Sequence, residues 1–384
     1  MAEDRPIRYF DHAATSWPKP PGVIDAMVRA IEDAGGNPGR GAHALALAAA
    51  RVVASARGEV AALLGVPDER DLIFTPGCTY GLNLVLKGAL APGDRVVVSA
   101  VEHNAVVRPL SVLAAAGVEV VVVAADREGR VDPDDVDSAV RQAPTRAVIC
   151  QHASNVTGTI QPVGDMADVA HAHGAVLIVD AAQAAGHLPV NVRALGPDAY
   201  ACSGHKGLLG PQGIGALYLA PGFEPRELIE GGGGGDSADT GQPTRRPDRY
   251  ESGTGNTPGA AGLGAATRYL REHGDALRDL ECTLTRRLHE GLVEIPGIRV
   301  LGPPPAEERA PVVSVVHERV PPDEIALALE RRAGIAVRTG LHCSPWAHQT
   351  VGTIETGAVR FGIGYGLTGE DVDVALEAMR DICR

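Results

Sequence analysis

The sequence predicts an α/β protein: a mostly parallel, doubly wound sheet in a large domain, followed by a smaller α/β unit. Three observations lead to this prediction. Short apolar runs alternate with helix-like segments through the first half of the chain, the composition changes around Gly231–Gly235, and strand-like and helix-like segments then resume. Repeated βα units of this length are typical of parallel sheets that carry helices on both faces.

The chain opens with an extended stretch, Tyr9–Thr15, and a proline-containing break, SWPKPP. Pro20 and Pro21 are predicted to open a helix that continues to about Asp33. After a glycine-rich loop, a second helix is predicted over 42–64. This helix carries Ala and Val on nearly every side, which is typical of a helix buried within a chain or between subunits.

The alternating region follows. Each predicted strand is a short apolar run bounded by turn residues, and each predicted helix has an apolar face. Asp132 stands where an N-cap is expected. The predicted strands are 71–75, 95–100, 118–124, 146–150, 175–180, 199–202 and 214–219. The predicted helices between them are 80–89, 105–116, 133–142 and 163–173.

The segment GGGGGDSADTGQPTRRPDRYESGTGNTPG lacks a helical period and predicts a long irregular segment, which is usually functional or a linker. A long amphipathic helix pair is predicted after it, over about 260–295. The last predicted elements are strands 299–301, 312–317 and 335–338, a helix over 322–332, and a final helix over 369–382 with Thr368 as its N-cap.

Composition excludes several function classes. The net charge of −13 argues against nucleic acid or an anionic membrane as the main partner, and no apolar run is long enough to span a bilayer. The first residues, MAEDRPIRYF, contain no apolar signal region. The six cysteines are scattered singly, without disulfide density or zinc spacing, so we expect a cytoplasmic protein without a metal site.

Two neighbouring strand ends carry complementary chemistry. The run Val176–Val179 stops at Asp180, and the run Ala199–Cys202 is followed by Ser203-Gly204-His205-Lys206. Pyridoxal phosphate needs this pair, because a lysine holds it as a Schiff base and an acidic group keeps its pyridine nitrogen protonated. On this stretch alone, purely structural roles, with Asp180 as a helix cap and Lys206 as a solvated charge, are about as well supported as cofactor binding.

Other candidates have similar alternatives. Thr79, between a strand and a helix, could bind phosphate or simply cap the helix. His103 follows a strand, where a lone His is most often structural, and Asn155 stands in a segment that also suits a turn.

Cys343 lies in a loop between Gly and Pro residues, and a reactive thiol needs a partly exposed site with positive charge or a hydrogen-bond donor nearby. Arg338 and His342 could supply that charge or donor. The alternative is a buried structural cysteine. Arg360 suits a substrate carboxylate, and its alternative is a surface salt bridge.

The motif DAAQAAG followed by SGHKGLLGPQG resembles the cysteine desulfurase branch of the class V aminotransferase family, which has the fold of type I pyridoxal-phosphate enzymes. VEHN, YESGTGNT and VRTGLHCSP resemble further segments of that family. The similarity extends from Tyr9 to the last helix. It implies a large cofactor-binding domain, 16–260, and a small domain, 1–15 with 261–384, that carries the cysteine loop.

The resemblance also implies a role for each candidate. Lys206 would hold the cofactor and act in catalysis with Cys343 and with His103, which would stack on the ring and relay protons. Asp180 would contact the pyridine nitrogen, Gln183 the phenolic oxygen, and Asn155 the cofactor hydroxyl and the substrate. The phosphate would be bound by Thr79, Ser203 and His205 and by Thr254 of the other subunit of a homodimer, and the substrate by Asn155, Arg338 and Arg360.

The implied reaction converts L-cysteine to L-alanine and leaves a persulfide on Cys343 for a sulfur acceptor protein. Two alternatives stay open. One is a selenocysteine lyase, which would take L-selenocysteine, a C–S lyase or an aminotransferase on the same scaffold. The other is a non-catalytic sulfur-carrier partner that has kept the fold.

Overall fold

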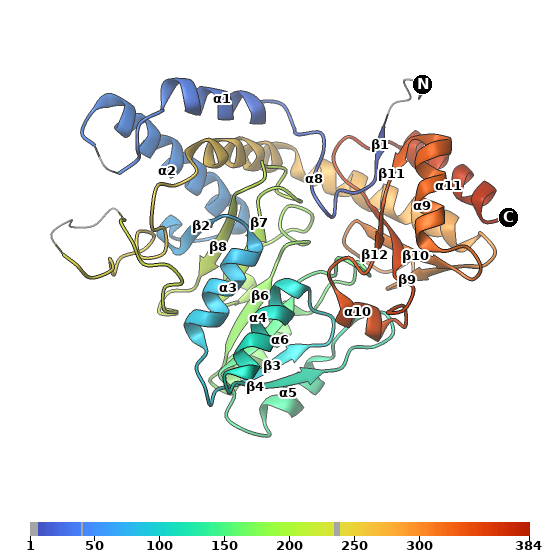
Figure 1. Cartoon of the computed structure of the whole chain (residues 1–384), viewed down its shortest axis with the longest axis horizontal. Coiled ribbons are helices and arrows are strands. Elements are labelled where there is room, and N and C mark those ends of the chain that lie inside the picture. The colour runs from blue at the N-terminus through green and yellow to red at the C-terminus, as the bar shows by residue number, and fades with distance from the viewer. Residues whose placement is uncertain (1–6, 40, 234–238) are drawn as a thin grey trace.

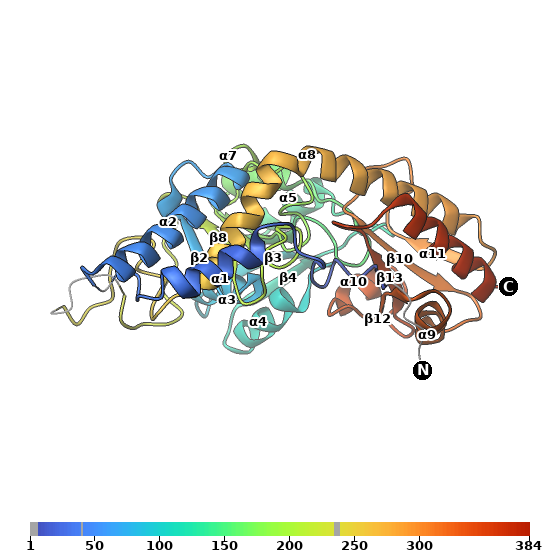
Figure 2. The ribbon, with the colours of Figure 1, turned by 90° about the horizontal axis from the view of Figure 1, so that it is seen from above.

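The computed structural model describes residues 7–39, 41–233 and 239–384, so Gly234 and Gly235 of the Gly231–Gly235 run lie outside the described residues. Figures 1 and 2 show a larger part around a central sheet and a smaller part at the C-terminal end, with the long helix α8 (Thr257–Val293) running along both. Within the described ranges, no helix is long and apolar enough to cross a bilayer.

The central sheet contains all seven predicted strands, in the order β2-β8-β7-β6-β5-β3-β4. Its pairings are parallel except that β8 runs antiparallel to β2 and β7, which confirms a mostly parallel sheet. Strands β3, β5 and β7 are buried along their whole length, as expected for strands covered on both faces. The strands are β2 (Leu72–Thr75), β3 (Arg95–Ser99), β4 (Glu119–Val123), β5 (Ala147–Gln151), β6 (Val176–Asp180), β7 (Ala199–Ser203) and β8 (Gly215–Leu219).

The four helices predicted between these strands are confirmed, and they cover opposite faces of the sheet. Side chains alternate between the faces, so Val96 and Val98 pack with α3 (Cys78–Ala89) and α4 (Asn104–Ala115), whereas Val97 packs with α5 (Pro133–Val140) and α6 (Val163–Ala172). The Asp132 side chain caps α5 as predicted. Helix α7 (Val192–Leu195) was not predicted, because four residues are too few to show a period.

The helices outside the sheet differ from prediction in two ways. Helix α2 (Ala44–Leu64) packs against α8 through small residues, but Leu45 and Leu47 are about half exposed, so the prediction of burial on every side is wrong for a single chain. The predicted helix pair is the single helix α8, because the buried Gly274 continues the helix instead of ending it. Helix α1 (Val23–Asp33) starts after Gly22, whose φ is +84°.

The smaller part has a four-stranded antiparallel sheet, in the order β12-β13-β10-β9, beside the short parallel pair β1-β11. The predicted strand 335–338 divides into β11 and β12, and β13, which carries Arg360, was not predicted. Thr368 forms a capping box with Asp371, as its N-cap assignment requires. The domain division at residue 260 stays a proposal. The elements are β1 (Arg8–Tyr9), β9 (Ile298–Leu301), β10 (Val312–His317), β11 (Ile335–Ala336), β12 (Arg338–Gly340), β13 (Ala358–Gly362), α9 (Pro322–Ala333), α10 (Pro345–Thr350) and α11 (Gly369–Ile382).

Candidate active site

A cavity lies at the carboxyl ends of β5, β6 and β7, where open α/β sheets place their ligands. Two of these strands end directly at predicted site residues, β6 at Asp180 and β7 at Ser203. The cavity therefore gathers residues from distant parts of the chain. The predicted site residues that line it are Thr79, His103, Asn155, Asp180, Gln183, Ser203 and Lys206.

The Asp180 carboxylate is buried, and only one of its two oxygens, Oδ1, has hydrogen-bond partners among the described residues. Its Oδ1 accepts a hydrogen bond from the backbone N–H of Ala182 at 2.9 Å, and the Cys78 thiol lies 3.3 Å away. The same thiol is 3.1 Å from the carbonyl oxygen of Ala201, so two acceptors compete for its proton. Among the described residues nothing binds Oδ2, which leaves that oxygen for a ligand. Sequence reasoning missed Cys78, because its only signal is its place at the first turn after β2.

Lys206 follows β7 in a tight turn, where its carbonyl oxygen accepts the N–H of Leu209 at 2.8 Å. Burial lowers the pKa of its ammonium group, and the Asp180 carboxylate opposes that shift only in part. A lowered pKa increases the fraction of neutral amine, which is the form that attacks carbonyl carbon or accepts a proton. Lys206 is therefore suited to chemistry that a solvated lysine performs poorly.

His103 caps helix α4. Its Nδ1 accepts the N–H of Ala105 at 3.0 Å, and burial lowers the pKa of the imidazole to about 4. The ring is therefore neutral near pH 7. Since Nδ1 is the acceptor, the proton resides on Nε2.

Two buried polar atoms near the cavity have no hydrogen-bond partner among the described residues. Gln183 donates Nε2–H to the carbonyl oxygen of Ala13 at 2.8 Å, but its Oε1 is unpaired. The Nε of Arg360 is also buried and unpaired. Native proteins rarely leave buried polar atoms unsatisfied, so these two atoms are available to a bound group.

The cysteine loop between β12 and α10 is tied to the large part of the molecule. Asn155 donates Nδ2–H to the carbonyl oxygen of His342 at 2.8 Å and accepts the Ser344 hydroxyl at 2.7 Å. The N–H of Asn104 binds the carbonyl oxygen of Cys343 at 2.8 Å. These bonds hold His342 and Cys343 at φ of +49° and +59°, a conformation that costs roughly 1–3 kcal/mol for each non-glycine residue.

The Cys343 thiol is exposed, and Nη2 of Arg338 lies 3.5 Å from its Sγ. Arg338 is therefore a positive charge beside this thiol, where the sequence predicts one. His342, the other candidate, adds no positive charge. His342 is buried, and burial lowers the pKa of its ring to about 2, so it is neutral.

The thiol lines a depression that adjoins the cavity. Thr79, His103 and Ala105 line both the cavity of Lys206 and a second depression that is also lined by Cys343. The exposed sulfur atom is thus not on a closed wall, and its depression adjoins the cavity of Lys206.

Arg360 is fully buried and does not form the surface salt bridge that was the alternative reading. Its Nη2 binds Asp11 at 2.9 Å and its Nη1 binds the carbonyl oxygen of Asn155 at 3.2 Å. Burial lowers its pKa, while Asp11 acts in the opposite direction. Arg360, Arg338 and His205 are outside the set of residues that line the Lys206 cavity.

Thr254 lies in a different depression, with Phe74 and Tyr250, and its hydroxyl accepts Nδ2–H of Asn37 at 3.3 Å. The structure therefore separates this residue from Lys206 of the same chain.

Known proteins resemble this chain over nearly its whole length. The family Aminotransferase class-V matches residues 8–375. A protein of Methanothermobacter thermautotrophicus named probable cysteine desulfurase is 37% identical and covers 97% of this chain and 94% of its own length. The apo structure of a cysteine desulfurase from Thermococcus onnurineus NA1 has a TM-score of 0.92 and 34% identity, with 98% and 94% covered.

The S-sulfonic acid form of the Escherichia coli cysteine desulfurase CsdA has a TM-score of 0.87 and 30% identity, and the alignment covers 97% of this chain and 94% of that chain. Fold and sequence thus agree along the whole length of the molecule. The chain belongs to the class V aminotransferase family.

Proposed function

We propose that the chain is a pyridoxal-phosphate-dependent cysteine desulfurase that converts L-cysteine to L-alanine and passes the sulfur to an acceptor protein. The observation that carries this proposal is the exposed Cys343 thiol on a groove that adjoins the cavity of Lys206. The relatives named as cysteine desulfurases support it. We also propose a cytoplasmic location, because all six cysteines are unpaired.

The residues of the cavity fit pyridoxal phosphate. Lys206 would bond it, the free Oδ2 of Asp180 would face its ring nitrogen, and the unpaired Gln183 would lie at its phenolic oxygen. Thr79 and the N-terminus of α3 would bind its phosphate together with Ser203 and His205. When bound, the cofactor supplies an electron sink for the electrons released at the substrate α-carbon.

Each side chain then has a task that its environment suits. The neutral amine of Lys206 accepts the α-proton of L-cysteine, and the neutral His103 offers a proton at Nε2. Arg338 and the unpaired Nε of Arg360 attract the substrate carboxylate. The Cys343 thiolate attacks the substrate sulfur, a new S–S bond forms as the substrate C–S bond breaks, and the three-carbon product leaves as L-alanine.

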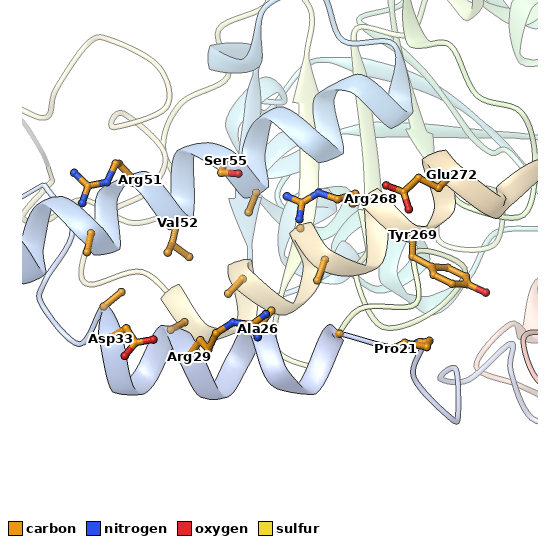
Figure 3. A pocket seen from close by; sticks show the side chains of 18 residues that line it. Pro21, Ala26, Arg29, Asp33, Arg51, Val52, Ser55, Arg268, Tyr269 and Glu272 are labelled. Atoms are coloured by element: carbon orange, nitrogen blue, oxygen red, sulfur yellow. The ribbon is translucent and has the colours of Figure 1, made fainter.

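We propose a homodimer, because Thr254 lines a different depression from Lys206 of its own chain. The exposed faces of α1 and α2 support this. Ile24, Val28 and Ile31 lie on one side of α1 and are 65%, 44% and 62% exposed. On the other side of α1, Figure 3 shows a hollow between α1, α2 and α8. Both charge signs occur there, which suits a two-fold interface that must complement itself. The charged residues that line it are Arg29, Asp33, Arg51, Arg268 and Glu272.

The test is alanine and sulfide production from purified protein supplied with pyridoxal phosphate. Lys206→Ala should lose both the cofactor absorbance and the activity. Cys343→Ser should keep the absorbance and lose desulfuration of cysteine. Cys282→Ser is the matched control, because Cys282 is the other exposed cysteine and lies on α8.

Full turnover of cysteine by Cys343→Ser would remove the persulfide step, and retained turnover of selenocysteine alone would favour a selenocysteine lyase. Protein that stays colourless with added cofactor would instead support a non-catalytic carrier.

A further inference from the structure

The groove that contains Cys343, here called the thiol groove, continues away from the cavity between α3 and α4. Helices α3 and α4 pack against each other and lie side by side in Figure 1. The groove is lined along its length by Thr79, Asn83, Lys87, Arg108, Val112 and Cys343. Among the described residues that line it, none is acidic.

Its two cations are not committed elsewhere. Lys87 and Arg108 are both exposed, and neither forms an ion pair within the described part of the chain. The chain carries a net charge of −13, so most of its surface repels anions. Because Lys87 and Arg108 are unpaired among the described residues, the thiol groove is a site on this surface that attracts negatively charged groups.

The cations lie at increasing distance from the thiol. Cys343 is at the N-terminal end of α4, because its carbonyl oxygen binds the N–H of Asn104. Arg108 is four residues further along α4, or about 6 Å at 1.5 Å per residue. Lys87 is eight residues, or about 12 Å, beyond Thr79 on α3, and Thr79 lines the groove together with Cys343. Both helices follow strands that point the same way, so both distances are measured in the same direction.

An extended peptide matches this spacing. It rises about 3.3 Å per residue and places alternate side chains on one face, so residues two and four positions from a cysteine lie about 7 Å and 13 Å from it. We propose that the sulfur acceptor is a protein that lays an extended acidic segment in the thiol groove. Its cysteine faces Cys343, and carboxylates at the second and fourth positions pair with Arg108 and Lys87.

The inference rests on the proposed function, because that reaction supplies the persulfide sulfur on Cys343 that is transferred. The acceptor thiolate attacks the outer sulfur of the Cys343 persulfide. The acceptor S–S bond forms, the bond between Cys343 Sγ and the outer sulfur breaks, and Cys343 leaves as a thiolate. The outer sulfur keeps its proton, so one thiolate and one persulfide stand on each side of the reaction, and no oxidant or reductant is needed.

Binding can be tested without desulfurase activity. Nine-residue peptides with a central cysteine are activated as 2-pyridyl disulfides, and their exchange with Cys343 is followed by release of pyridine-2-thione. The first peptide has Glu at the second and fourth positions on both sides of the cysteine and Thr elsewhere. The second has the same composition with Glu moved to the first and third positions, and the third has Gln for Glu. Cys282→Ser is the parent protein, and Cys343→Ser supplies the background rate.

At low salt, the first peptide should react about threefold faster than the second and about tenfold faster than the third, since each exposed ion pair contributes up to about a factor of five. These preferences should shrink at high salt. In Lys87→Gln/Arg108→Gln the three rates should agree within about twofold. Arg193→Gln, on α7 at the opposite face of the sheet, should behave like the parent.

Equal rates for the first two peptides in the parent would overturn the extended register. So would an unchanged preference in Lys87→Gln/Arg108→Gln. A small anion is tested by comparing the exchange rates of glutathione disulfide and the uncharged 2-hydroxyethyl disulfide. If the ratio of these two rates equals the ratio for the first and third peptides, the occupant is a small anion and the peptide proposal is wrong. Alanine production with uncharged dithiothreitol as acceptor reports on the proposed function separately, because the exchange requires only the Cys343 thiol.

Discussion

Breaking the ion pair between Arg57 and Glu251 should be among the more costly substitutions of paired charges in this chain. Arg57 on α2 binds both oxygens of Glu251, at 2.6 and 2.8 Å, and also the carbonyl oxygen of Leu72 at 2.6 Å. Its guanidinium lies over the Phe74 ring, 4.6 Å from the centroid. Glu251 in turn accepts the N–H of Phe74 at 2.6 Å, so the pair joins α2, β2 and the loop that carries Thr254.

A second pair provides the control. Arg130 and Glu307 have the same closest N–O distance of 2.6 Å, but their side chains are 45% and 43% exposed, against 8% and 22% for Arg57 and Glu251. Exposed pairs contribute about 0–1 kcal/mol, whereas removing one partner of a buried pair costs about 3–5 kcal/mol. Because Glu251 keeps some contact with water, we expect a coupling of about 3 kcal/mol for the first pair and under about 1 kcal/mol for the second.

The assay is a double-mutant cycle for each pair, with unfolding in urea as the readout. Arg57→Met, Glu251→Gln and their combination form one cycle, and Arg130→Met, Glu307→Gln and their combination form the other. Each single variant of the first cycle should lose most of what the double variant loses. Equal coupling in the two cycles would refute the argument that burial, and not N–O distance, decides the strength of these pairs.

Three further predictions follow from single residues. Burial raises the pKa of the Glu102 carboxyl to about 8, so the folded state keeps a proton that the unfolded state releases above about pH 4.5. The Tm advantage of the wild type over Glu102→Gln should therefore fall as pH rises between those values, and a constant difference would contradict this. Gly186 has φ +91°, and an added Cβ would lie 2.1 Å from the carbonyl oxygen of Gly207. Gly186→Ala should therefore prevent stable folding or lower Tm by many degrees. A Tm within a few degrees of wild type would be inconsistent with this packing. Cys78→Val removes the thiol beside Asp180 and should weaken retention of pyridoxal phosphate several-fold in an absorbance titration, whereas unchanged affinity would show that Ala182 alone orients the carboxylate.

Local patterns in the sequence determined most of the fold. The seven strands of the central sheet are short apolar runs that end at turn residues, and Asp132 and Thr368 cap helices because their side chains reach backbone N–H groups within the same turn. The placement of Asp180 and Lys206 in one cavity was also predictable, since strands that point the same way bring their carboxyl ends to one edge of the sheet. Each of these inferences needs only residues that are close in sequence or a rule of sheet geometry.

Tertiary structure decided how residues far apart in the chain meet. The burial that keeps His342 neutral, the contact of Cys78 with Asp180, and the two hydrogen bonds by which Asn155 holds the cysteine loop all join segments that carry no local sign of one another. The same holds for the contact between Arg360 and Asp11, because nothing near either residue in the sequence predicts that the two are buried together. Desolvation and side-chain hydrogen bonding depend on the neighbours that packing supplies, and those neighbours are set by the whole fold.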